Sequence, residues 1–450
     1  MNLHAADPRK GGHDGDHDGY LVSRPQAWFA FAMTFALMLF DYIDRQVIVS
    51  LFPHLKTAWA LSDKQLGALV SVISIVVAVG GLPVALLADR FSRVKSIVVM
   101  ATVWSLATIS CMFARSYGQL FAARAIVGVG ETGYGSVGAA LIASLFPKRL
   151  RATLMGAFFA AGSIGAVLGV LLGGVISTHW GWQAAFGVVG LPGLLLALLY
   201  LFVPDYKTVA MAPGGAQAQQ SVGTLLQRVV TALTSSRTLW WTCLGAAFQL
   251  IVVSTLWSWL PSYLNRYHGT PPDRAAMQAA LVVLCGALGA FVWGVVADVV
   301  AARRQRNRLI AVAMLAIVAL LVFMTAFGTA MPPNQQFLLI AIGGFLMTCT
   351  VAPASSVVFD VIHPGVRSTG AALLSLFQNL FGLAIGPFVG GAMSDAWGLQ
   401  TALAVMPLFG VVAAGCFLLA ARSYETELKR VATVPMDAEP AASPSAVASA

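Results

Sequence analysis

The stretch Phe40-Asp41-Tyr42-Ile43-Asp44-Arg45-Gln46 interrupts the first long apolar run of the chain, which covers residues 28–51. A helix through this run places Asp41, Asp44 and Arg45 at i, i+3 and i+4, and therefore on one face. Ionisable groups inside a helix of membrane length are costly unless they face protein or water. The stretch therefore predicts a transmembrane helix whose charged face points into a bundle.

The composition predicts an all-α integral membrane protein. Of the 450 residues, 58% are hydrophobic and 10% are charged, whereas soluble domains average ~25% charged residues. The apolar residues form blocks of about 20, the length that spans the hydrocarbon core as a helix, and they lack the alternation of barrel strands. The five cysteines lie in apolar runs without a CxxC pair, so we expect no disulfide, no metal site and no cofactor.

Twelve spans are predicted, and they divide the chain into two six-helix bundles. The spans cover residues 27–51, 64–86, 96–114, 120–145, 152–177, 183–203, 239–263, 276–299, 309–330, 337–361, 368–393 and 401–421. The predicted domains are a disordered tail (1–25), an N-terminal bundle (26–203), a polar linker (204–238), a C-terminal bundle (239–421) and a second disordered tail (422–450).

The basic residues predict the orientation of these spans. An even number of spans places both termini on one side, and the loops and termini of that side hold 20 Lys and Arg against five on the other. Cytoplasmic loops carry such an excess. We therefore expect cytoplasmic termini in an inner (plasma) membrane. The formal charge of +9 reflects these loops, and no nucleic-acid partner is predicted.

A repeated motif relates the two bundles. Residues 173–183 after span 5 and residues 390–400 after span 11 both read G-G-x-x-S-x-x-W-G-x-Q. Each copy follows the same helix of its own half, so the repeat is parallel, six helices against six. Alternating-access carriers have this architecture, with sites between the halves near the midplane.

Span 4 carries a second pair of ionisable residues. Arg124 and Glu131 are seven residues apart, which is two helical turns, and they share a face. Because span 1 runs outward and span 4 inward, Arg124 is expected near the depth of Asp44. Glu131 is expected deeper. The predicted contacts are an outer Asp44–Arg124 pair and a deeper Glu131–Arg45 pair.

Three acids then face two bases, so one carboxyl lacks a full partner. Burial disfavours the ionised form of a carboxyl group, a property that a proton-coupling site needs. The competing interpretation is a static, fully paired network that holds spans 1 and 4 together. Because intramembrane charges are functional by default, we expect Asp41, Asp44 and Glu131 to serve proton coupling. Arg45 and Arg124 would then bind an anionic substrate.

The loop after span 2 resembles a known family signature. Asp89, Arg90 and Arg93 match the G-x-x-x-D-R-x-G-R-R/K loop of the major facilitator superfamily, with the family's two glycines replaced. Asp298 follows span 8 in the second half, where Val296-Ala297-Asp298 echoes Leu87-Ala88-Asp89. The resemblance implies a gating role for these four charged residues.

The charged segment of span 1 is similar to the N-Y-x-D-R segment of the spinster-like branch of that superfamily, with Asp41 in place of the usual Asn. The similarity continues through residues 62–67, 104–108, 124–131, 145–147 and 190–193. It implies that Asp44 and Arg45 take the family's D-R positions, and that Arg124 and Glu131 take the span 4 positions. It also implies an amphiphilic, lysolipid-like substrate.

Neutral polar side chains are the candidate substrate contacts outside this cluster. They are Tyr134 in span 4, Gln249 and Trp257 in span 7, and Gln378 and Asn379 in span 11. Ordinary hydrogen bonds between helices or a place in the aromatic interface belt explain the C-terminal residues equally well.

The function predicted from the sequence is secondary active transport by alternating access, proton-coupled, of an amphiphilic or small organic anion. An organic-acid/proton symporter of the anion:cation symporter type, which shares the span 1 motif, is the alternative carrier. A channel or a transporter-like sensor is the alternative outside the carriers. No catalytic constellation or Walker-type loop occurs, so an enzyme is not predicted. The expected partners are the substrate, protons and the lipid bilayer, and the expected state is a monomer.

Overall fold

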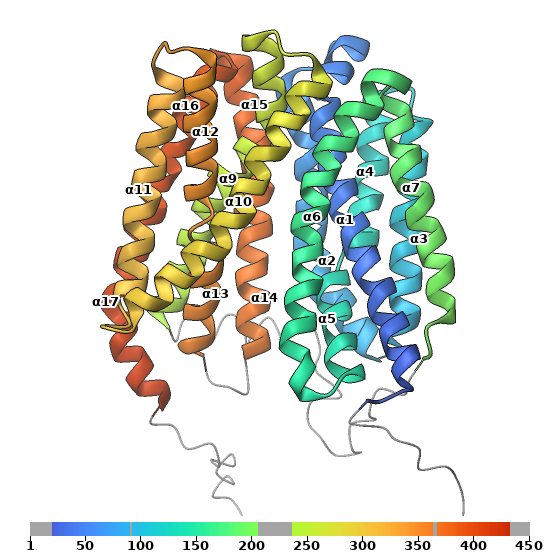
Figure 1. Ribbon diagram of the computed structural model, residues 1–450, viewed down its shortest axis with the longest axis vertical. Helices are drawn as coiled ribbons and strands as arrows, with labels where there is room; N and C mark the ends of the chain where they lie inside the picture. Colours follow the sequence, from blue (N-terminus) through green and yellow to red (C-terminus); the bar gives the residue numbers. More distant parts are fainter. Residues whose placement is uncertain (1–19, 91, 206–235, 363–366, 433–450) are drawn as a thin grey trace, which may run out of the picture.

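A computed structural model describes residues 20–90, 92–205, 236–362 and 367–432, and these residues form helices without strands (Figure 1). The N-terminal helices are α1 (Arg24–Trp59), α2 (Asp63–Arg90), α3 (Arg93–Met112), α4 (Tyr117–Glu131), α5 (Tyr134–Leu145), α6 (Lys148–Trp180), α7 (Trp182–Leu199) and the short η1 (Tyr200–Phe202).

The C-terminal helices complete the fold. They are α9 (Arg237–His268), α10 (Pro272–Ala301), α11 (Asn307–Gly328), α12 (Pro333–Met347), α13 (Val351–Asp360), α14 (Arg367–Phe377), the π-helical η3 (Gln378–Leu383), α15 (Ile385–Trp397), α16 (Leu399–Val405), the short η4 (Met406–Leu408) and α17 (Phe409–Ala432). The described segments contain twelve helical stretches long and apolar enough to cross a membrane, which confirms the predicted number of spans.

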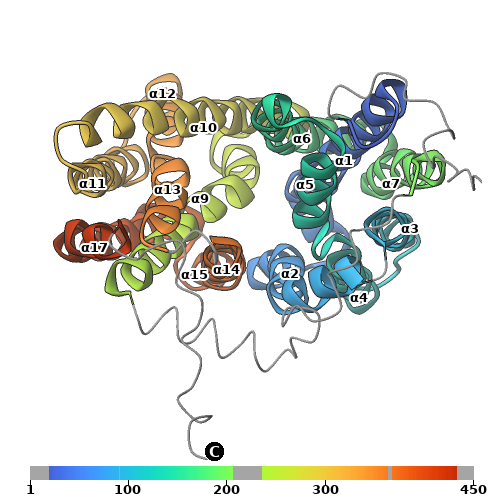
Figure 2. The same cartoon turned by 90° about the horizontal axis from the view of Figure 1, so that it is seen from below.

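The helices form two bundles that lie side by side, α1–α7 in one and α9–α17 in the other (Figure 2). We refer to them as the N half and the C half. The main contacts between the halves are α2 with α14 and α15, α6 with α10, and α1 with α9. Both described ends of the chain lie at the same end of the molecule (Figure 1). We call the opposite end the distal end.

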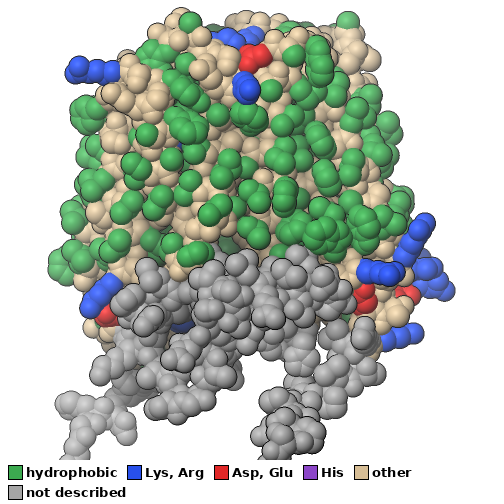
Figure 3. Space-filling model, turned by 180° about the vertical axis from the view of Figure 1, so that it is seen from behind, with side chains coloured by type: hydrophobic (Ala, Val, Ile, Leu, Met, Phe, Trp, Pro, Cys, Tyr) green, Lys and Arg blue, Asp and Glu red, His purple; other side chains and the backbone are tan. Residues whose placement is uncertain are grey.

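Apolar side chains cover the middle of the visible face, whereas Lys, Arg, Asp and Glu gather near its two ends (Figure 3). Large exposed side chains such as Phe202, Phe291 and Trp397 contribute to the apolar surface. A membrane-spanning bundle needs this distribution, because lipid solvates apolar side chains and excludes charged ones.

Spans 4 and 10, which the sequence predicts to be continuous helices, are each broken in the structure. They occupy equivalent positions in the two halves. Span 4 divides into α4 and α5, because Gly133 adopts φ 83°, in the left-handed region that glycine tolerates. Span 10 divides into α12 and α13 at residues 348–350. There, the Thr348 hydroxyl donates to the carbonyl of Gly286 on α10 at 2.8 Å.

The last helix is longer than predicted. The expected tail 422–450 is helical as far as Ala432, because α17 continues as one helix from Phe409. Its Glu427 caps the start of α9, accepting from the Ser236 hydroxyl at 2.5 Å and from the Arg237 amide at 3.0 Å. At the other end of the chain, α1 already begins at Arg24. Most of the predicted tail 1–25, most of the linker 204–238 and residues 433–450 lie outside the described residues.

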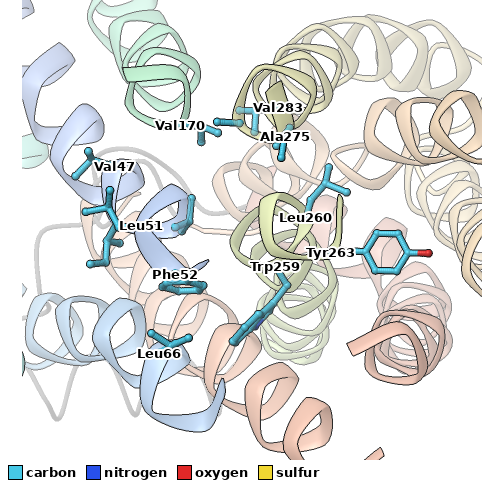
Figure 4. Packing of buried hydrophobic residues seen from close by; sticks show 14 of the residues in the cluster. Val47, Leu51, Phe52, Leu66, Val170, Trp259, Leu260, Tyr263, Ala275 and Val283 are labelled. Carbon is cyan, nitrogen blue, oxygen red and sulfur yellow. The ribbon is translucent and has the colours of Figure 1, made fainter. Parts of the chain in front are cut away.

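The two halves share an apolar core at the distal end. Phe52 of α1 and Trp259 of α9 meet with ring centroids 5.0 Å apart, and Leu66 of α2 lies beside them (Figure 4). All three side chains are buried. This core joins the halves above the level of the charged residues of α1.

Candidate functional site

The charged residues predicted to meet inside the N half do meet there. Asp41 and Asp44 of α1 and Glu131 of α4 are at most 3% exposed, and Arg124 is 0% exposed. Arg45 is the most accessible of the group, with 19% of its side chain exposed. The site therefore combines four buried ionisable groups with one cation that is partly accessible.

Asp44 is held by hydrogen bonds on both carboxylate oxygens. Arg124 Nη1 donates to its Oδ1 at 3.2 Å and to its backbone carbonyl at 3.3 Å. The hydroxyl of Thr108 on α3 donates to its Oδ2 at 2.5 Å. The predicted Asp44–Arg124 pair is confirmed. The fully bonded carboxylate and the buried guanidinium tie α1, α3 and α4 together.

Sequence reasoning missed the role of Thr108. Its segment, residues 104–108, supported the family resemblance, but no charge or spacing marked the hydroxyl as a partner of Asp44. A polar residue within an apolar span at the depth of a charged neighbour is the signal that could have identified it.

Arg45 lies between the two other carboxyls. Its Nε is 2.9 Å from Glu131 Oε2 and 3.5 Å from Asp41 Oδ2, which confirms the predicted Glu131–Arg45 contact. These contacts lack hydrogen-bond geometry. Both Glu131 oxygens, Asp41 Oδ1 and Arg45 Nε are buried without a hydrogen-bond partner among the described residues. This part of the cluster is charged but poorly bonded.

Small residues let α4 approach its neighbours closely enough to place these charges. A Cβ on Gly128 would lie 3.0 Å from Val76 Cβ of α2, and one on Gly130 would lie 2.7 Å from Trp104 Cβ of α3. Glycines commonly permit such close approach of transmembrane helices. The helix then ends at Glu131, where the chain breaks before α5, so the carboxyl group stands at a helix terminus rather than within a continuous span.

The predicted neutral contacts are dispersed. Tyr134 is buried and donates to the Thr34 carbonyl at 2.6 Å, within the N half. In the C half, Gln249 is buried and its Nε2 donates to the Met347 carbonyl at 2.9 Å. The Trp257 indole nitrogen is buried and has no hydrogen-bond partner among the described residues.

Gln378 and Asn379 lie in η3, the π-helical turn of span 11. Asn379 Nδ2 donates to the Ser375 carbonyl of its own helix at 2.9 Å. Such turns often occur at functional sites. Within the described part of the chain, no hydrogen bond or ion pair joins any of the C-half candidates to the charged cluster.

The predicted gating residues are only partly described, since the side chains of Asp89 and Arg90 lie outside the described residues. Arg93 Nη1 donates to the Ser144 hydroxyl at 2.9 Å, within the N half. Asp298 pairs with Arg308 at 2.8 Å within the C half. Arg308 also binds Asp360 at 3.0 Å, so this cluster joins α10, α11 and α13.

Comparison with known families gives one match over most of the chain. The family model described as Major Facilitator Superfamily matches residues 34–383. A spinster homolog 3 protein of Danio rerio is 26% identical over 91% of this chain and 88% of its own length. A gallate transporter of Pseudomonas putida is 27% identical over 84% of this chain and 88% of its own length.

A solved structure has the same fold. It is the crystal structure of a bacterial homolog of the human lysosomal transporter spinster, in an inward-facing and unoccupied conformation. The TM-score is 0.80 at 23% sequence identity, and the alignment covers 90% of this chain and 99% of that chain.

Proposed function

The chain belongs to the major facilitator superfamily and is a multi-pass membrane transporter related to the spinster proteins; from that premise we propose that it couples the movement of an organic anion to protons. The proposal centres on Arg45, because this cation is partly exposed and is bound by Glu131 and Asp41 without hydrogen bonds. Asp44, whose two oxygens are both hydrogen-bonded, is proposed to hold Arg124 in place.

In this scheme, Glu131 and the anionic group of the substrate compete for Arg45. When Glu131 takes up a proton, Arg45 loses its nearest counter-charge and can bind a carboxylate or phosphate group instead. Proton uptake and anion binding therefore promote one another, and linkage makes the effect reciprocal. Asp41 Oδ2 lies 3.5 Å from Arg45 Nε, and we propose that this carboxylate continues to compensate part of the Arg45 charge.

The substrate class follows from this arrangement and from the relatives. Within the charged cluster, Arg45 is the cation that is partly accessible, and one cation suits a substrate with one anionic head group. The resemblance of span 1 to the spinster-like branch favours an amphiphile, whereas the gallate transporter of Pseudomonas putida favours an aromatic acid, the alternative of the organic-acid/proton symporter. Uptake into proteoliposomes under an imposed pH gradient, with lysophospholipids in one arm and hydroxybenzoates in the other, decides between them. Uptake that does not saturate in either arm favours a channel, and binding without uptake favours a sensor.

The coupling proposal is tested with Glu131→Gln. We expect the variant to lose gradient-driven accumulation, to keep counterflow exchange, and to bind substrate with an affinity that no longer depends on pH. Glu425→Gln makes the same chemical change on α17 in the C half and is the matched control. Gradient-driven accumulation that survives in Glu131→Gln would contradict the assignment of Glu131 as the proton carrier.

The orientation is part of the proposal. We propose that both termini are cytoplasmic in an inner (plasma) membrane and that the protein works as a monomer. The cytoplasmic placement of the termini is supported by the excess of 20 to five basic residues on their side. Protease digestion of a C-terminal tag in inside-out and right-side-out vesicles tests the orientation.

A further inference from the structure

The hydrogen bonds and ion pairs that join the two halves within the described residues all lie at the distal end, at Asp63 and its neighbour Lys64. The side-chain contacts are those of Asp63. This residue begins α2 and is 2% exposed. Arg266 of α9 binds it with two nitrogens, Nη1 to Oδ2 at 2.6 Å and Nη2 to Oδ1 at 2.8 Å. Ser394 of α15 donates to Oδ2 at 2.5 Å, and Lys56 of α1 contacts Oδ1 at 2.5 Å. A carboxylate of the N half is thus held by two residues of the C half.

The reverse contact lies beside it. Asp395 of α15 accepts from the backbone amides of Asp63 and Lys64, each at 2.8 Å. These amides belong to the first turn of α2, where a helix has no internal acceptors and where a negative charge is favoured. A carboxylate of the C half is thus held by the N half.

Residues of the N half cap only part of the N-terminus of α2. The Ser62 hydroxyl accepts from the Gln65 amide at 3.2 Å, and Gln65 Oε1 accepts from the Ser62 amide at 3.0 Å, the reciprocal arrangement of a capping box. Asp395 accepts from the two amides between them, those of Asp63 and Lys64. The first turn is therefore complete when the halves are together, yet it keeps a cap of its own when they separate.

Close backbone packing continues this contact toward the middle of the molecule. Gly67 of α2 lies against the Pro387 carbonyl of α15, and Gly174 of α6 lies against Ala276 of α10. Phe52 and Trp259 fill the junction between the halves (Figure 4), and Trp259 Nε1 donates to the same Pro387 carbonyl at 3.0 Å. The distal end therefore has an outer polar layer and an inner apolar layer. In the inner layer, Gly67 and Gly174 have no room for a larger side chain.

We propose that Asp63 and Asp395 form a reciprocal latch that holds the distal end closed and opens to expose the junction beneath it. When the latch opens, water solvates the separated charges and offsets part of the lost attraction. The contact is therefore reversible. Lys56 stays with Asp63 in the N half, and it leaves that carboxylate paired after Arg266 has moved away. The inference rests on alternating access in the proposed function and deepens it by naming the residues that close one side.

The test measures exposure rather than transport, so its outcome is separate from that of the coupling proposal. The reporter is Leu66→Cys, at a buried position one turn below Asp63 and beside Phe52 (Figure 4), in a protein whose five native cysteines are replaced by alanine. The probe is a membrane-impermeant maleimide applied from the distal side of reconstituted vesicles. The measured quantity is the labelling rate.

We expect Asp63→Asn and Asp395→Asn each to raise the labelling rate by about tenfold, the scale of one lost hydrogen bond to a charged group. Asp205→Asn is the matched control, since its partners Ser92 and Lys95 both lie in the N half, and it should leave the rate unchanged. An unchanged rate in both latch variants overturns the proposal.

Milder variants keep the test decisive if an aspartate variant fails to fold. Ser394→Ala and Arg266→Gln each remove part of the grip on Asp63 and leave its carboxylate in place. We expect an increase in labelling for both, larger for Arg266→Gln because it removes two hydrogen bonds. Monodisperse elution in detergent confirms that each variant is folded. Equal labelling of these variants and the parent protein counts against the latch.

Discussion

Hydrogen bonding distinguishes two kinds of buried carboxyl group in the charged cluster. Asp44 has a donor on each oxygen, from Arg124 and Thr108, so its charged form is stabilised where it lies. Glu131 faces Arg45 at ion-pair distance with neither oxygen hydrogen-bonded within the described residues. A buried, unbonded charge is costly. The first arrangement is suited to holding helices together, and the second to exchanging a proton or a partner.

The first prediction follows from this division. Asp44→Asn should lower the unfolding free energy by about 3–5 kcal/mol, the cost of removing one partner from a buried pair, because Arg124 is fully buried. Glu131→Gln should cost clearly less, since Arg45 is partly exposed and keeps Asp41. Thermal unfolding in one detergent, followed by tryptophan fluorescence, measures both.

A double variant provides the control for that comparison. Asp44→Asn combined with Arg124→Gln removes both charges, and it should be more stable than Asp44→Asn alone because no buried charge is left unpaired. If Glu131→Gln lowers the melting temperature as much as Asp44→Asn, the division between a structural and an exchanging carboxyl is wrong.

At the level of helices, the two broken spans place functional groups at helix ends. The break in span 4 comes directly after Glu131, and the Thr132 hydroxyl donates back to the Gly128 carbonyl at 2.6 Å. At the equivalent break in span 10, the Thr348 hydroxyl donates to the Gly286 carbonyl of α10. Free backbone groups at such breaks are tolerated in a membrane where neighbouring side chains satisfy them. The breaks therefore fix where α4 ends and where the Glu131 side chain is presented.

The second prediction compares two glycines at this break. Gly133→Ala should destabilise the protein by about 1–2 kcal/mol, because φ 83° is unfavourable for a residue with a Cβ. Gly135→Ala, two residues on, is the control: a Cβ there meets nothing within 4 Å, and the helix should gain up to about 1 kcal/mol. Melting temperatures and counterflow rates measure the effects. Equal stability of the two variants would show that the break does not depend on the left-handed glycine.

At the level of the whole molecule, much of the fold could be predicted from sequence. Blocks of apolar residues give the number of spans, and helical spacing together with span direction gives the pairs Asp44–Arg124 and Glu131–Arg45. The breaks could not be predicted, because hydropathy is continuous across residues 120–145 and glycine is common in transmembrane helices. The latch could not be predicted either, since Asp63 and Asp395 are 332 positions apart and no local pattern links them.

The repeated G-G motif shows how the two halves use one sequence pattern for two contacts. The first glycine packs inside its own half: Gly173 lies against the Val47 carbonyl of α1, and Gly390 lies against Thr255 of α9. The second glycine faces the other half. Gly174 lies against Ala276 of α10, and Gly391 lies against the backbone of Asp63 on α2 and also touches the Trp259 ring of its own half. Adjacent glycines thus serve the stability of a bundle and the closure between bundles.

The last prediction separates these two roles. Gly173→Ala and Gly390→Ala should lower the melting temperature, because the added methyl group meets closely packed atoms inside one bundle, and they should leave the labelling of Leu66→Cys from the distal side unchanged. Gly174→Ala should do the reverse: the halves can relieve its clash by separating, so labelling rises while each bundle keeps its stability. Gly391→Ala should also raise labelling, with a smaller loss of stability, because its methyl group also meets Trp259 of its own half. Both measurements on the four variants test the division. If all four lower the melting temperature alike and none raises the labelling, the distal contact is part of a rigid core and does not open.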